Sequence, residues 1–94
     1  MNGMARATVE LPSLLRDVLH KESLNVEGQT LEDALEDAYA QLPGLRVHVC
    51  DETGKLRQHV LCFLNDANTR GLEYAKQPIT DGDTITILQA VSGG

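Results

Sequence analysis

One amphipathic helix limits the folds open to this chain more than any other feature. Between residues 29 and 44, apolar side chains recur at helical spacing and form a single stripe. Thr30 and Asp33 make a capping-box-like pair at its start, and Pro43-Gly44 predicts its end. The stripe consists of Leu31, Ala34, Leu35, Ala38 and Leu42. A helix with one apolar face must bury that face against another layer, and the rest of the chain predicts a sheet.

Alternating apolar and polar residues predict strands on both sides of this helix. Before the helix, the inward positions are Ala7, Val9 and Leu11, followed by Leu24 and Val26. After the helix, three further segments have the same period of two. The predicted strands are residues 6–12, 22–28, 45–50, 59–66 and 80–91.

The order of these elements predicts an α+β fold, with one long helix packed across a mixed sheet of four or five strands. Residues 13–21 form either a helical turn or an irregular crossing, and residues 69–80 have no regular pattern. Because one helix covers only one face of such a sheet, the other face is left open to solvent or to a partner.

The open face predicts a docking surface. In residues 59–66, Leu61 and Phe63 alternate away from the apolar positions that face the helix, and Phe63 is the only phenylalanine in the chain. Exposed apolar groups favour docking. Leu88 is assigned to the same surface. The alternative is that a loop at residues 71–78 covers these side chains.

Length and composition predict one domain, residues 1–94, with an aliphatic core, because the chain has no Trp and is 41% apolar. No apolar run approaches the ~20 residues needed to span a bilayer. The N-terminus lacks the apolar block of a signal peptide. We therefore expect a cytoplasmic protein that does not associate with membranes, in which Cys50 and Cys62 are reduced thiols.

The formal net charge of −6 disfavours nucleic acid as a partner, because the phosphate backbone would repel the chain. Either a partner with a basic surface or solubility alone would account for this charge. Glu32, Asp33, Glu36 and Asp37 lie near the start of the predicted helix, where the dipole favours negative charge. We expect them to form a solvated face rather than a cation site.

Two histidines and two cysteines raise the question of a metal or a catalytic pair. His48 and Cys50 would share one face of a strand, whereas His59 and Cys62 fall on opposite faces of a regular strand. That geometry argues against a zinc site. A catalytic Cys–His pair would lack an oxyanion loop. We therefore predict no metal site and no catalytic residue.

The end of the chain resembles a known family. Residues 81–94, "DGDTITILQAVSGG", are similar to the C-terminus of the ubiquitin-like sulfur carriers of the ThiS/MoaD family, and so are "FLNDANTR", "ATVELPSLLRDV" and "GQTLEDALEDA". The resemblance implies a β-grasp (ubiquitin-like) fold with a flexible C-terminal tail at residues 91–94. Residues 43–66 are most similar to the carrier that feeds cysteine synthesis. Gln89 and Ser92 depart from the family pattern, which leaves the pathway open.

The resemblance implies a chemistry at Gly94. An adenylating enzyme of the ThiF/MoeB type would use ATP, bound by that partner, to activate the Gly94 carboxylate, and sulfide would then displace AMP. The resulting thiocarboxylate would donate sulfur to a synthase for cysteine, homocysteine, a siderophore or a similar product. The chain would be a protein-borne reagent rather than an enzyme, with no bound cofactor. In some relatives a metalloprotease trims a longer precursor back to the terminal glycine.

Small residues suit a tail that must enter another protein's active site. Val91, Ser92, Gly93 and Gly94 reach about 13–14 Å when extended, and the glycines have no Cβ to obstruct a narrow passage. The alternatives are a frayed terminus or a cloning remnant. Three other functions remain: a ubiquitin-like modifier conjugated through Gly94, the small subunit of molybdopterin synthase, and an interaction module with an inert tail.

Overall fold

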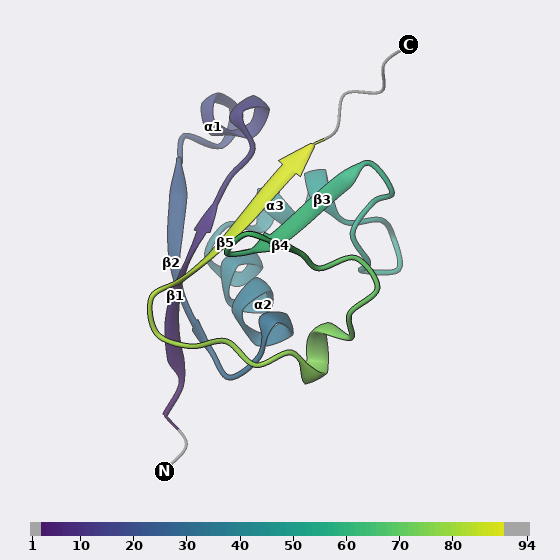
Figure 1. Cartoon of the computed structure of the whole chain (residues 1–94). Helices are drawn as coiled ribbons and strands as arrows, with labels where there is room; N and C mark the ends of the chain where they lie inside the picture. The colour runs from purple at the N-terminus through teal and green to yellow at the C-terminus, as the bar shows by residue number, and fades with distance from the viewer. Residues whose placement is uncertain (1–2, 90–94) are drawn as a thin grey trace.

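The computed structural model describes residues 3–89, which form a five-stranded mixed sheet with helices on one face (Figure 1). The strand order is β2-β1-β5-β3-β4, and only the central pair β1 and β5 is parallel. The two strands at the ends of the chain thus lie side by side, which is the β-grasp (ubiquitin-like) arrangement expected. The elements are β1 (Ala5–Glu10), α1 (Ser13–Leu19), β2 (Ser23–Gly28), α2 (Leu31–Gln41), α3 (Pro43–Val49), β3 (Val60–Leu64), β4 (Ala67–Asn68), a 3-10 turn η1 (Tyr74–Lys76) and β5 (Asp83–Gln89).

The core lies between the sheet and α2, which packs across one face as predicted (Figure 1). Tyr39 adds an aromatic ring to an otherwise aliphatic interior. The fully buried aliphatic side chains include Val9, Leu11, Val26, Leu31, Leu45, Ile85 and Ile87. No helix within residues 3–89 is long and apolar enough to cross a bilayer.

The predicted helix start is confirmed. The Asp33 backbone N–H donates to Thr30 Oγ1 at 3.2 Å, and the Thr30 backbone N–H donates to Asp33 Oδ2 at 3.3 Å. This capping box satisfies two backbone donors that the first turn leaves without helical partners. Its geometry also fixes where β2 ends and α2 begins.

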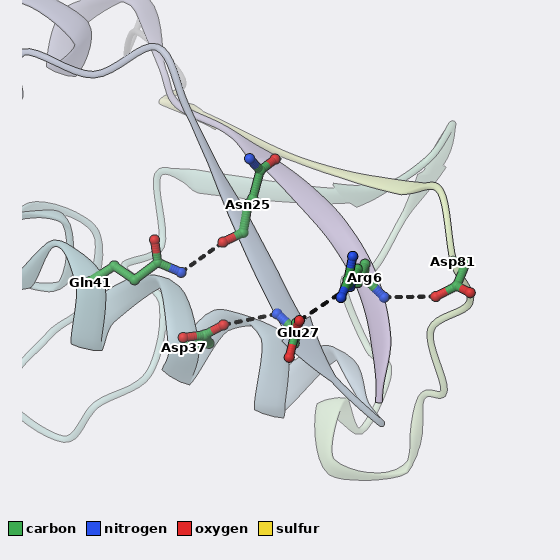
Figure 2. A network of polar contacts seen from close by, with 6 residues as sticks. All are labelled: Arg6, Asn25, Glu27, Asp37, Gln41 and Asp81. Carbon is green, nitrogen blue, oxygen red and sulfur yellow. Dashed lines mark hydrogen bonds and ion pairs between the residues drawn. The ribbon is translucent and has the colours of Figure 1, made fainter. Parts of the chain in front are cut away.

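Side chains of α2 bond to the outer edge of β2 (Figure 2). The Glu27 N–H donates to Asp37 Oδ2 at 2.8 Å, and Gln41 Nε2 donates to the Asn25 carbonyl at 2.7 Å. A third bond, from the Gln29 N–H to Asp33 Oδ2 at 3.1 Å, continues the row. Four helical residues rise about 6 Å and two strand residues rise about 6.6–6.8 Å. The two periods match well enough for successive helix turns to reach alternate strand residues.

The predicted strand at residues 45–50 is wrong, because this segment is the helix α3. Leu45 and Val49 are fully buried, whereas Val47 between them is 69% exposed. Residues four apart share a face in a helix as well as in a strand, so the apolar pattern alone fits both. Pro43 at the first turn favours the helix. The expectation that Pro43-Gly44 ends α2 holds, but a second helix follows directly.

Other segments are more regular than the sequence indicates. Residues 13–21 contain the helix α1, and the irregular segment at 69–80 contains η1. The fifth strand is β4, whose two residues pair with Phe63 and Leu64 of β3. A strand of this length has no detectable period, which is why it was not predicted.

Candidate functional site

Strand β5 leads directly to the C-terminal segment and is held at the centre of the sheet. Ile85 and Ile87 point into the core, and Gln89 pairs with Val60 at the end of the ladder with β3. The predicted tail residues, Val91 to Gly94, lie outside the described residues. The site therefore consists, in structural terms, of the surface surrounding the end of β5.

The structure brings the three predicted docking residues together. Leu61 and Leu88 are direct cross-strand partners on β3 and β5. Phe63 pairs with Thr86, two residues further along each strand and on the same face. Leu88 is 43% exposed, while Leu61 and Phe63 are half-buried. These three side chains, on the face opposite α2, are called the apolar corner below. Its role in docking stays a prediction.

The rest of this open face is polar. Thr8 pairs with Thr84 across β1 and β5, and Thr86 follows on the same face of β5. All three threonines are half-buried. Apolar surface on the face is thus concentrated beside the end of β5. A partner that binds there is brought close to the segment that follows Gln89.

The loop at residues 71–78 is fixed to the start of α2. The Leu31 N–H donates to the Gln77 carbonyl at 2.8 Å, and Thr30 forms an isolated bridge with Pro78. Tyr74 in the same loop hydrogen-bonds the buried Thr69 hydroxyl. Burial raises the pKa of Tyr74 to about 12, so its hydroxyl stays protonated at neutral pH. These bonds draw the loop toward α2, which covers the opposite face of the sheet from the apolar corner.

The start of β5 is held by a clamp that sequence reasoning missed. Asn65 Nδ2 donates to Asp83 Oδ1 at 3.1 Å, and the Thr84 N–H donates to Asn65 Oδ1 at 3.0 Å. Partial burial favours the protonated form of Asp83. Hydrogen bonds from Thr80 and Asn65 nevertheless outweigh it and hold the pKa of this carboxyl below its ordinary value. The sequence signals are Asn65-Asp66 after β3 and Asp81-Gly82-Asp83 before β5, but neither pattern predicts that the two turns contact each other.

The two cysteines are buried and free, and each lies in the core. Cys62 faces inward from β3, as expected for a small core side chain, and burial raises the pKa of its thiol. Cys50 follows α3 rather than ending a strand. A protonated, covered thiol is a poor nucleophile. Within residues 3–89, no group of three His, Cys, Asp or Glu side chains is arranged to hold a metal ion.

The sheet order, the covering helix and a central strand that runs to the C-terminal segment define a ubiquitin-like β-grasp protein. A model of the ThiS family matches residues 9–94, and the chain therefore belongs to the ThiS family.

Relatives resemble the chain over nearly its whole length. The sulfur carrier protein CysO of Mycobacterium tuberculosis is 34% identical over 90 residues, which cover 93% of this chain and 97% of that protein. In the crystal structure of the Amycolatopsis orientalis BexX/CysO complex, the matching chain is 30% identical with a TM-score of 0.78, covering 94% of this chain and 99% of that one. Small archaeal modifier protein 1 of Methanosarcina acetivorans is also 30% identical, with a TM-score of 0.77 and coverage of 97% and 98%.

Proposed function

We propose that this protein is a sulfur carrier whose Gly94 carboxylate is converted to a thiocarboxylate. One observation carries the proposal: the CysO relative that aligns with most of the chain is a named sulfur carrier. The family match, which extends through Gly94, supports it. The fold is consistent with this role. Strand β5 is anchored on both sides by β1 and β3, so that the residues after Gln89 start from a rigid base.

The chemistry requires two steps at one carboxyl group, the first at an oxygen atom and the second at the carbon atom. The Gly94 carboxylate attacks the α-phosphate of ATP, which forms an acyl adenylate and releases pyrophosphate. Hydrosulfide then attacks the acyl carbon, AMP leaves with the electrons of the broken C–O bond, and loss of a proton gives the thiocarboxylate. Both steps leave the oxidation state of carbon and sulfur unchanged.

The chain itself supplies the reacting carboxylate and a surface by which enzymes hold it. An adenylating enzyme of the ThiF/MoeB type binds the ATP, and a synthase accepts the sulfur for cysteine, homocysteine, a siderophore or a related product. The apolar corner docks these partners. This assignment makes the protein a substrate and donor rather than a catalyst. It also agrees with the burial of Cys62 and the raised pKa of its thiol, which disfavour that side chain as a point of sulfur attachment.

An intact-mass experiment tests the carrier role. The full chain is incubated with an adenylating enzyme of the ThiF/MoeB type from the same organism, ATP and sulfide. The expected product has one terminal oxygen exchanged for sulfur, and neither omission of ATP nor a variant lacking Gly94 gives it. The same mass for the wild-type chain before and after reaction, with an enzyme shown to activate another carrier, would contradict the proposal.

Conjugation to other proteins is the second candidate, favoured by the likeness to small archaeal modifier protein 1. In that case the acyl adenylate is attacked by a lysine amine of a target rather than by hydrosulfide. Incubation in a cell extract with ATP would then produce a ladder of higher-mass species that contain this chain. The ladder would require Gly94, like the thiocarboxylate.

A further inference from the structure

The positive charges of this acidic chain are unevenly engaged. Within residues 3–89, ion pairs to carboxylates occupy four of the basic side chains. These are Arg6, Arg16, Arg46 and Lys76. The eight Lys and Arg residues of the chain thus leave Lys21, Lys55, Arg57 and Arg70 without an ion pair in the described part. Two of these, Arg57 and Arg70, lie in one groove.

The groove has a volume of about 210 Å³ and lies between the loop before β3 and the segment after β4. Arg70 Nη2 donates to the Gln58 carbonyl at 3.3 Å, which holds its side chain across the groove. Arg57 Nη2 reaches the Val47 carbonyl at 3.5 Å. The other polar lining side chains are neutral, and no carboxylate is among the described residues that line it. Each guanidinium keeps donors for an incoming acceptor, since arginine has five N–H groups.

The groove adjoins both parts of the proposed site. Leu61 of the apolar corner is one of its lining residues. Val60, also in the lining, pairs with Gln89 at the end of β5. A protein that binds the apolar corner and receives residues 90–94 therefore binds next to the groove that the two arginines line.

We propose that this groove receives an Asp or Glu side chain of the enzyme that binds the tail. The inference rests on the proposed function, because it assumes such an enzyme. Guanidinium groups bind carboxylates by charge-assisted, often paired, hydrogen bonds. In a chain of net charge −6, an acidic contact is attractive only where such cations gather. The contact orients the partner over the end of β5.

A phosphate of the ATP consumed at Gly94 fits the groove less well than a carboxylate. The reacting carboxylate is five residues beyond Gln89, and five extended residues span about 16–18 Å. The groove lies at the base of that segment, whereas the nucleotide must meet its tip. The partner's protein surface is what meets the base.

Charge reversal tests the groove. R57E and R70E are compared with K21E, a matched control that makes the same change of charge. Lys21 lies just before β2, and the central strands β1 and β5 separate β2 from β3 and the groove. The readout is adenylation of the carrier by the ThiF/MoeB-type enzyme, which is measured by pyrophosphate exchange. We expect each groove variant to raise the KM for the carrier about tenfold or more, with kcat little changed and K21E close to wild type. The difference in KM between the groove variants and the wild type should shrink as NaCl is raised from about 0.05 M to about 0.5 M.

The outcomes separate the two proposals. If the wild-type chain is not adenylated at all, the proposed function fails. If the wild type is adenylated and R57E and R70E behave like K21E, the groove has no part in binding and the inference fails. Amide NMR signals of Arg57 and Arg70 that shift on addition of ATP alone would identify a phosphate site and overturn the assignment to a carboxylate. Rescue of R57E by a lysine replacing an acidic residue of the enzyme would establish the pair.

Discussion

Asn65 joins two turns that are distant in the sequence and lie together at the start of β5. It is one of two non-glycine residues with positive φ in residues 3–89, at 56°. Its side chain bonds Asp83 and the backbone of Thr84, and its own N–H donates to the Thr84 carbonyl at 2.7 Å. Asparagine tolerates the left-handed region better than most residues. The residue therefore combines a backbone role and a side-chain role at one position.

Substitution separates these two roles. N65A removes both side-chain bonds and places alanine in the left-handed region, so we expect a loss of about 2–3 kcal/mol in the free energy of unfolding. N65G removes the same bonds but accepts positive φ, so the loss should be about half as large. Urea unfolding of the purified variants measures both values. Equal losses in N65A and N65G would show that the backbone conformation contributes nothing.

Among the elements, α3 is where the apolar pattern misleads. Leu45, Val47 and Val49 alternate as a strand would, yet Leu45 and Val49 are also one helical turn apart. A strand would bury all three on the same face of the sheet. The helix buries the first and third and exposes the second.

Two substitutions distinguish the helix from the strand. V49A should cost about 2 kcal/mol, because it removes buried methyl groups from the core. V47E should change stability by no more than about 0.5 kcal/mol, because its side chain is in solvent. Thermal and urea unfolding measure both. A large loss in V47E would indicate that residue 47 is buried, as in the strand first predicted.

The pattern of success across elements has a physical explanation. Strands β1, β2, β3 and β5 and the helix α2 were predictable because each buries one continuous face and so keeps a clear period. The apolar corner was predictable for the same reason, since alternation in residues 59–66 places Leu61 and Phe63 opposite the core. The groove was not predictable, because Arg57 precedes β3 and Arg70 follows β4, and only the fold brings both to the lining of one groove. No periodic signal marks such a contact.

At the scale of the whole molecule, global folding protects both thiols that the described residues contain. Cys50 and Cys62 are 4% and 3% exposed and lie in the same core as Val9 and Ile85. Reagents reach either thiol only when the packing around it opens, at least locally. The core thus keeps both cysteines from competing with the chemistry proposed for the Gly94 carboxylate.

Thiol labelling measures this protection. At neutral pH, iodoacetamide should leave the native chain largely unmodified and should modify both cysteines in urea, because burial shields the thiols and raises the pKa of Cys62. A peptide map locates any label. Rapid labelling of Cys62 in the native protein, at a rate near that in urea, would mean that the core opens far more readily than its packing indicates.

The bonds from α2 to β2 also determine how this molecule meets other chains. An edge strand normally offers a row of free backbone groups to which a peptide can add as a further strand. Here Asp37 and Gln41 already bond two of those groups on β2, and Asp33 bonds the Gln29 N–H directly after the strand. The opposite edge of the described sheet is β4, with only two residues. Association by strand addition is therefore hindered at one margin and barely supported at the other. We therefore expect partners to bind side chains of this protein rather than its backbone. Edge-to-edge aggregation of several copies is disfavoured for the same reason.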